Sequence, residues 1–243
     1  MRMHTFASRN AKEILRDLIN LAFGLGFPLA LLLLLSAIQA NIPVALFELQ
    51  YLAPGIAVFG LSFITLFSAS IIAKDRSSAL LQRLYTTPLR AADFILGYTL
   101  PMIPIAIAQC VICYAAAALL GLAITVNVLY AVAAIVPASV LYIALGLLCG
   151  SVLNDKQVGG ICGALLTNLS AWLSGIWFDL NLMGGTFKKI AYALPFVHAV
   201  DLQRAVLAGD FAGIFPHIWW VLGYAVGLLA ASIILFLRQM KKQ

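Results

Sequence analysis

The chain has 243 residues, of which 63% are apolar and only 10% are charged, and its mean hydropathy is +1.03. A soluble domain carries far more charge, so this composition predicts a polytopic membrane protein and leaves no room for a sizeable soluble domain. The net charge of +6 is a feature of nucleic-acid-binding proteins too, but the positions of the basic residues indicate membrane topology instead.

The N-terminal segment, residues 1–17, mixes basic, acidic and apolar positions. It is compatible with a short helix in the cytoplasmic interface or with a frayed basic tail. If the segment is a helix, Phe6, Ile14 and Leu15 are expected to lie on lipid, and Arg9, Lys12 and Arg16 are expected to face water.

Six apolar runs are long enough to cross a bilayer, which takes about 20 residues of helix. They are Leu18–Ala40, Tyr51–Ala73, Ile95–Leu120, Val128–Leu153, Val158–Phe178 and Ile218–Leu237. Helices are expected, because lipid offers no partner for a free backbone amide and the alternation of a barrel strand is absent. The first run is too long for the apolar core of a signal peptide, so it is expected to be an uncleaved span.

Basic residues are divided unevenly between the two sides that six spans define. One side holds 12, in the N-terminal segment, two loops and the tail: Arg2, Arg9, Lys12, Arg16, Lys74, Arg76, Arg83, Arg90, Lys156, Arg238, Lys241 and Lys242. The other side holds three: Lys188, Lys189 and Arg204. Because Lys and Arg concentrate in cytoplasmic loops, both termini are expected in the cytoplasm and the protein in the plasma membrane, with no nucleic-acid partner.

Small and polar residues mark the faces where helices meet. Three Gly-x-x-x-Gly pairs match a close-packing motif: Gly146 and Gly150, Gly159 and Gly163, and Gly223 and Gly227. In the fifth run a 3-4-3-4 spacing places five such residues on one face: Gly160, Gly163, Thr167, Ser170 and Ser174. That face either packs against a helix or lines a wet cavity, and the second run offers a similar set that includes Ser62 and Thr65.

The segment between the fifth and sixth runs, residues 179–217, is long and contains two apolar patches that are too short to span. We expect short re-entrant helices that dip into the outer leaflet and break at Pro195 and near Gly209.

Catalytic chemistry is absent from the sequence. There is no phosphate-binding Gly-x-x-x-x-Gly-Lys-Ser/Thr loop, the three histidines lie outside the runs, and no carboxylate lies deep in any run. The pair Cys110 and Cys113 has the spacing of a metal or redox site, but no His, Asp or Glu accompanies it in that run, so two small core residues are favoured. We therefore expect no catalytic residue, no metal site and no driving force within the chain.

Residues 74–94, "KDRSSALLQRLYTTPLRAADF", lie between the second and third runs. Leucines recur at helical spacing and Pro88 disfavours helix at the preceding residue, so an amphipathic helix is expected to end before it. On the cytoplasmic side this helix either lies on headgroups or docks its leucines into a partner's groove.

This stretch resembles the loop between spans two and three of ABC-2-type transporter permeases. That loop begins with an acidic-basic-acidic group and continues with Gly-Thr-Leu, a Leu shortly before a Pro, and a Gly that opens the third span. The matching residues are Asp75, Arg76, Leu81, Leu84, Pro88 and Gly97, and the departures are Ser77, Ala79 and Leu80. The six-span layout is similar as well, and "LPFVHAVDLQRAVLAGDF", residues 194–211, resembles the family's outer segment.

The resemblance implies an all-α, single transmembrane domain over residues 1–243 that forms a homodimer or pairs with a sister permease. Each half would bind a separate ATPase subunit, which carries the ATP and Mg, so that no cofactor is expected in this chain. The amphipathic coupling helix would transmit ATP-driven motion, assisted by the N-terminal helix and the loop Asn154–Gln157. Its ATPase-coupling residues would be Asp75, Arg76, Leu80, Leu81, Arg83, Leu84, Tyr85 and Pro88.

In the family, spans two and five face the centre of the dimer, which would place a substrate pathway near Ser62, Thr65, Gly160, Gly163, Thr167, Ser170 and Ser174. The implied function is export of a hydrophobic or amphipathic compound, such as a drug, antibiotic, peptide or lipid. The alternatives are a self-contained secondary carrier or channel, which would transport without a partner, and a membrane enzyme or scaffold, for which no residue set is visible.

Overall fold

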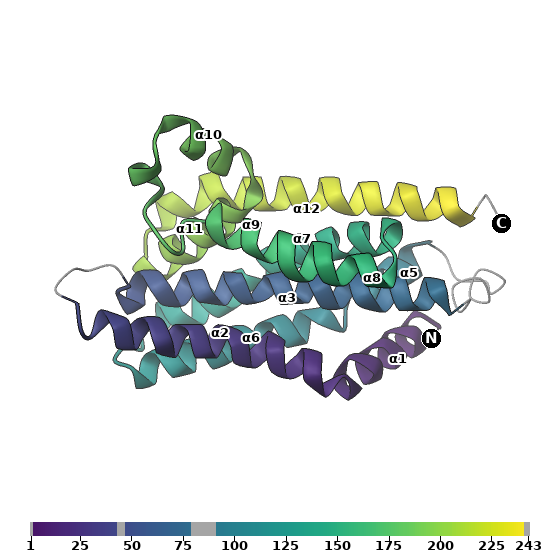
Figure 1. The fold of residues 1–243 in the computed structure, drawn as a ribbon, viewed down its shortest axis with the longest axis horizontal. Helices are drawn as coiled ribbons and strands as arrows, with labels where there is room; N and C mark the ends of the chain where they lie inside the picture. Colours follow the sequence, from purple (N-terminus) through teal and green to yellow (C-terminus); the bar gives the residue numbers. More distant parts are fainter. Residues whose placement is uncertain (1, 43–46, 79–90, 241–243) are drawn as a thin grey trace.

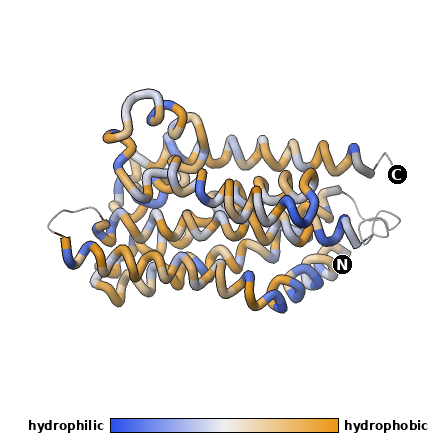
Figure 2. The backbone as a smooth tube through the Cα atoms, in the orientation of Figure 1, coloured by the Kyte–Doolittle hydropathy of each residue, from blue (hydrophilic) through white to orange (hydrophobic). Residues whose placement is uncertain are grey.

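A computed structural model describes residues 2–42, 47–78 and 91–240 as a bundle of helices (Figure 1). The long helices run side by side, and both ends of the chain lie at the same end of the bundle, on the right of Figure 1. Apolar residues cover most of the length of the bundle, whereas hydrophilic residues gather on α1, Arg2–Arg16, and at the helix ends (Figure 2). This distribution fits a bundle whose middle is surrounded by lipid.

Five described helical stretches are long and apolar enough to cross a membrane. They are α2 (Leu18–Gln39), α3 (Leu49–Ser77), α5 with α6 (Ala91–Thr99 and Met102–Leu119), α7 (Val126–Val152) and α12 (Phe211–Met240). They coincide with five of the six predicted runs. The break between α5 and α6 falls at Pro101, which has no backbone N–H to continue the helix.

The fifth predicted run differs from the others, because no single helix fills it. It is divided into α8 (Asp155–Val158), a π-helical segment (Gly159–Leu166) and α9 (Thr167–Trp172). The helix ends at Trp172 and not at Phe178 as predicted, and Gly175 in the following turn has a φ of +69°, a conformation that favours glycine. The fifth predicted span, and with it the count of six spans, therefore stays a prediction.

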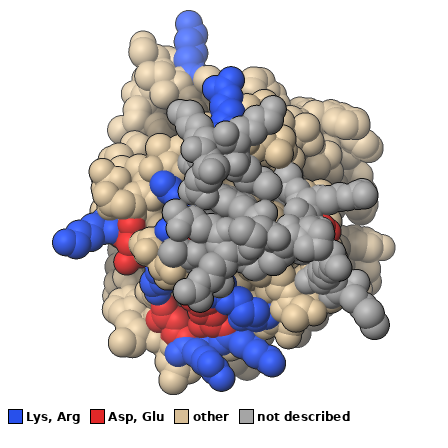
Figure 3. Space-filling model, turned by 90° about the vertical axis from the view of Figure 1, so that its right-hand side faces the viewer, with Lys and Arg blue, Asp and Glu red and all other residues tan. Residues whose placement is uncertain are grey.

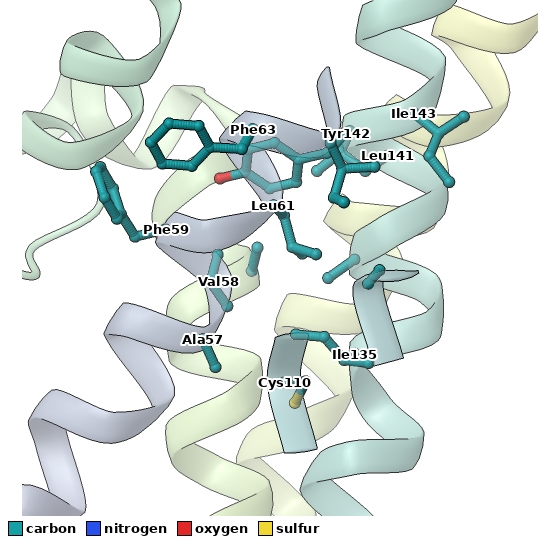
Figure 4. Close-up of a cluster of buried hydrophobic side chains, with 14 of the residues drawn as sticks. Ala57, Val58, Phe59, Leu61, Phe63, Cys110, Ile135, Leu141, Tyr142 and Ile143 are labelled. Carbon is teal, nitrogen blue, oxygen red and sulfur yellow. The ribbon is translucent and has the colours of Figure 1, made fainter. Parts of the chain in front are cut away.

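The centre of the bundle is α3, which packs against α2, α6, α7 and α11. In its most apolar stretch of 18 residues, 83% are buried. Figure 4 shows part of this core, where Phe63 of α3 lies beside the ring of Tyr142 of α7. The close approach of α7 to α3 depends on the first of the predicted glycine pairs. A Cβ atom would lie 2.6 Å from the Thr65 carbonyl oxygen at Gly146 and 2.7 Å from the Ala69 carbonyl oxygen at Gly150.

The segment before α12 lies at the end of the bundle opposite the termini (Figure 1). It contains a 3₁₀ turn (Leu180–Met183), α10 (Gly185–Ala193) and α11 (Pro195–Ala208). Both expected breaks are present: Pro195 opens α11, and Gly209, with a φ of +75°, ends it. α12 begins at Phe211, within the predicted outer segment 179–217, so the helix is longer than the predicted run Ile218–Leu237.

Candidate functional site

The end of α3 that lies near the termini carries a buried carboxylate, Asp75, whose residue is 1% exposed. Arg9 of α1 donates two hydrogen bonds to it, at 2.7 and 2.8 Å, and the Tyr98 hydroxyl of α5 donates a third at 2.8 Å. Burial lowers the pKa of Arg9, but the hydrogen bonds and charge of Asp75 outweigh it and raise that pKa above its ordinary value. We name Asp75, Arg9 and Tyr98 the Asp75 anchor; it joins three helices at one point.

The same end of the bundle holds α1 through an apolar contact. The Phe6 ring packs edge-on against Phe94 and Tyr98, with centroids 5.7 and 5.0 Å apart, and Asn10 donates to the Gly97 carbonyl at 3.0 Å. Gly97 has no side chain that would clash with the Phe6 ring, which lies directly over its Cα. The predicted short helix at residues 1–17 thus exists as α1.

The predicted lipid-facing set of α1 needs correction. Phe6 and Ile14 are both buried inside the protein and not on lipid, and Phe6 lies against Gly97 of α5. Leu15, by contrast, is 56% exposed. One face of the helix, with Phe6 and Ile14, therefore lies against the bundle, and another face, with Leu15, points outward.

Arg76, the neighbour of Asp75, points to another helix. Its Nη1 donates to the carbonyl oxygens of Gly150 and Leu153, at 2.8 and 3.2 Å, at the C-terminal end of α7. A cation at this position satisfies carbonyls that the helix leaves unpaired. Asp75 and Arg76 together tie α1, α5 and α7 to the end of α3, just before residue 79.

The other predicted coupling residues, Leu80, Leu81, Arg83, Leu84, Tyr85 and Pro88, lie outside the described residues. The amphipathic coupling helix therefore stays a prediction. Charged side chains gather around this end of the molecule (Figure 3). The loop Asn154–Gln157 also lies here, and Asn154 and Gln157 cap the short helix α8 by exchanging hydrogen bonds at 3.1 and 2.9 Å.

The predicted pathway residues of α3 and α9 meet around one tyrosine. Thr65 donates to the Tyr142 carbonyl at 2.8 Å, and the Tyr142 and Ser170 hydroxyls are 3.4 Å apart. Ser62 and Ser174 each donate to a carbonyl three residues earlier in their own chain segment. These four residues are buried within the protomer, so they pack between helices in this conformation.

The π-helical segment explains why the predicted face divides. Thr167 donates through Oγ1 to the Cys162 carbonyl, five residues earlier, at 3.0 Å, and both residues are buried. The wider turn rotates Gly160 outward, where a Cβ would meet nothing within 4 Å, and leaves Gly163 in ordinary contact with Leu66. A π turn is an uncommon distortion that recurs at functional sites.

The outward side of α9, which follows the π-helical segment, carries a residue that the spacing argument missed. Asn168 is exposed, and its amide donates to the Ala164 carbonyl at 2.8 Å. Its exposed neighbours Leu165 and Trp172 are apolar. The sequence could have indicated Asn168, because it is a polar amide within an apolar stretch. The spacing argument missed it because Asn168 does not lie on the face that the small residues share.

Histidines meet at the opposite end of the bundle. The Nδ1 atoms of His198 in α11 and His217 in α12 are 2.9 Å apart, and His198 Nε2 lies 3.0 Å from the Tyr192 carbonyl. Among the described residues, no group of three or more His, Cys, Asp or Glu side chains could hold a metal ion.

Residues 2–208, from α1 to the end of α11, match the family model of the ABC-2 type transporter. The chain belongs to the ABC-2 type transporter family. No curated protein matches it significantly. An ABC-2 permease is the membrane component of a transporter and is not itself catalytic, and the family normally works with an ABC ATPase. The Asp75 anchor thus belongs to a multi-pass membrane protein with transport function.

Proposed function

We propose that this ABC-2 permease forms the membrane pathway of an ATP-driven exporter in the plasma membrane, with both termini in the cytoplasm. The observation that carries the proposal is the joining of α1, α5 and α7 to α3 by Asp75 and Arg76, immediately before residues 79–90. A force applied to those residues by a partner would reach four helices through two neighbouring side chains. The common location of both termini at this end and the charged surface there support the orientation.

The ATPase is a separate subunit in this proposal, and the leucines of residues 80–84 dock into it. ATP and Mg bind to that subunit and not to the permease. The N-terminal helix α1 moves with the docking segment, because Arg9 and Phe6 link it to α3 and α5. The loop Asn154–Gln157 follows the same motion, because Arg76 donates to the Gly150 carbonyl at the end of α7, just before this loop.

The substrate route lies between two permease copies, either a homodimer or a pair with a sister permease. The outward face of the π-helical segment and α9, with Gly160 and Asn168, supports this placement, because an amide exposed to lipid is unfavourable and a partner or a wet route would satisfy it. Ser62, Thr65, Gly163, Thr167, Ser170 and Ser174 lie one layer behind that face and would reach the route only after the helices move. The substrate is hydrophobic or amphipathic: a drug, antibiotic, peptide or lipid.

Co-purification tests the coupling. The permease is expressed alone and together with the ATPase encoded beside it, and is then purified in detergent. The natural chain is compared with Leu84→Asp and with a matched control, Leu182→Asp. Leu182 is an 81% exposed leucine at the opposite end of the bundle. Loss of the ATPase from Leu84→Asp alone is the expected result. Retention of the ATPase by Leu84→Asp would reject docking through this segment.

The same experiment distinguishes the exporter from the alternative function, a self-contained carrier or channel. A natural chain that binds no ATPase, and that moves solute in liposomes under an ion gradient alone, would favour that class. Flux that requires ATP and the second subunit would reject it.

A further inference from the structure

A cavity of about 560 Å³ lies at the end of the bundle opposite the termini, among the start of α3, the turn after α9, α10 and α11. Its volume is within the usual range for small-molecule sites. Its lining has two parts. The apolar part comprises Leu52, Ile176, Phe178, Leu180 and Val197, and the polar part comprises Ser174, Asp179, Tyr192, Asp201 and Arg204.

Each nitrogen of the single arginine in the lining faces an oxygen of the protein. Arg204 donates through Nη2 to the Gly175 carbonyl at 2.9 Å and through Nε to the Tyr51 carbonyl at 3.3 Å. Its Nη1 faces Asp201 at 3.6 Å, so each of its three nitrogens has an oxygen partner. Arg204 therefore holds the turn and the start of α3 in place, and its guanidinium is directed at oxygens of the protein.

The two carboxylates of the lining use only part of their capacity to accept hydrogen bonds. Asp201 has two long contacts, one with Arg204 at 3.6 Å and one from the Tyr192 hydroxyl at 3.3 Å. Asp179 uses a single oxygen, Oδ1, to accept from the backbone and side chain of Asn181. An ionised carboxylate can accept about four hydrogen bonds, so both retain acceptor capacity toward the cavity.

An ammonium group of the protein already lies beside two lining residues, Asn181 and Tyr192. Lys188 Nζ lies 5.7 Å from the centroid of the Tyr192 ring and donates to Asn181 Oδ1 at 2.6 Å. This is the distance at which an aromatic face attracts a cation. Burial, followed by the charge of Asp201, raises the pKa of Tyr192, and the charge of Arg204 opposes this shift.

We propose, on the basis of the exporter function above, that this cavity binds the ammonium group of an amphipathic cationic substrate on its way out of the protein. The ammonium donates to Asp201 and Asp179 beside the Tyr192 ring, and the apolar body lies against Leu52, Ile176 and Val197. Lys188 competes for the same place and must leave when the ligand enters. The outer cavity thus selects for positive charge, whereas the apolar part accepts varied shapes.

Two probes of equal length test the charge preference: 4-phenylbutylammonium and the neutral 4-phenyl-1-butanol. Binding to the purified full-length permease in nanodiscs is measured by calorimetry without the ATPase. The ammonium is expected to bind about tenfold more tightly than the alcohol. Equal affinities would overturn the proposal.

Two substitutions with opposite expected effects keep the test independent of folding damage. Asp201→Asn should weaken the ammonium about tenfold, while Lys188→Met should strengthen it a few-fold, and neither should alter binding of the alcohol. The matched controls are Asp210→Asn and Lys189→Met, exposed residues of the same segment that do not line the cavity. Unchanged ammonium affinity in both Asp201→Asn and Lys188→Met would reject the site.

The result is separable from the exporter proposal. If the ATPase co-purifies but the ammonium shows no preference, the cavity assignment fails and the exporter proposal stands. If the ammonium binds with the expected variant pattern but no ATPase associates, the site stands and the exporter proposal fails.

Discussion

Two helices of this permease carry the same glycine spacing and use it differently. In α7, Gly146 and Gly150 lie against the backbone of α3, so closely that a Cβ at either position would lie within 2.7 Å of a carbonyl oxygen. In α12, Gly223 and Gly227 face outward, and a Cβ at either would meet nothing within 4 Å. The spacing alone therefore does not say whether a helix has a partner within the protomer.

The difference shows where the protomer is complete and where it is open. The α3–α7 contact forms the interior, and it is reinforced by Thr65 and Arg76, which donate to carbonyls of α7. The outward glycines of α12 lie in a shallow groove beside Trp219 and Tyr224. Substitutions that are disruptive in the first place should be tolerated in the second.

The largest expected effect comes from enlarging one glycine of each pair. Gly150→Leu should destabilise the protein by about 3 kcal/mol, because the new side chain meets backbone atoms of Ala69, which cannot move aside as a flexible side chain would. Gly227→Leu should change the stability little. Thermal unfolding in detergent, followed by size-exclusion chromatography, measures both, and equal losses would contradict the contrast between the packed and open helices.

The second effect compares adjacent charges on α3. Asp75 is buried in the Asp75 anchor, whereas its neighbour Lys74 forms a 3.6 Å pair with Asp17 in which both side chains are about a third or more exposed. Asp75→Asn should cost about 2 kcal/mol, because the negative charge is lost and an NH2 donor replaces one of the two oxygens that accept from Arg9, although Arg9 itself remains partly solvated.

The matched change is Asp17→Asn, which should cost about 0.5 kcal/mol because exposed pairs contribute little. Both variants are compared by the same thermal assay and by the ATPase retained on co-purification. Reduced ATPase binding in Asp75→Asn at a temperature where the fold is intact would link the anchor to coupling. Equal behaviour of the two variants would show that burial of Asp75 has no special role.

Much of this arrangement could be predicted from local sequence, and the remainder depends on distant partners. The apolar runs and the breaks at Pro195 and Gly209 follow from length and backbone chemistry, so they were predictable. The burial of Phe6 depends on the missing side chain of Gly97, which is remote in sequence. The division of the fifth run depends on the π turn at Thr167, which no hydrophobic periodicity reveals.

The third effect compares a buried and an exposed polar residue near the proposed route. Thr65→Val should cost about 1 kcal/mol, because the hydroxyl bond to the Tyr142 carbonyl is lost while the shape is kept. Asn168→Leu should leave protomer stability unchanged, because its amide contacts only its own helix, but it should alter the substrate range in a transport assay. A stability loss in Asn168→Leu with unchanged transport would reverse the assignment of the two faces.

The smallest effect concerns the contact of α11 with α12, which depends on protonation. His198 Nε2 faces the Tyr192 carbonyl, so it carries the hydrogen, and Nδ1 then accepts from His217. The ring also stacks on Trp220 at a centroid distance of 4.9 Å. Burial, the largest cause, lowers the pKa of His198; the Tyr192 carbonyl and Asp201 oppose this shift, and the charge of His217 adds to it.

Acid should therefore loosen this contact. The unfolded chain has the ordinary histidine pKa of about 6.5 and binds a proton there more readily than the folded chain, so stability declines as the pH falls below that value. Comparing melting temperatures at pH 7.5 and 5.5 should show the decline in the natural chain and a smaller one in His198→Gln. His4→Gln, a change of an exposed histidine on α1, should keep the full decline. Protonated His198 would present an Nδ1 hydrogen to the Nδ1 hydrogen of His217, so its protonation must destabilise this contact. Identical pH dependence in all three proteins would therefore mean that groups other than His198 control the decline.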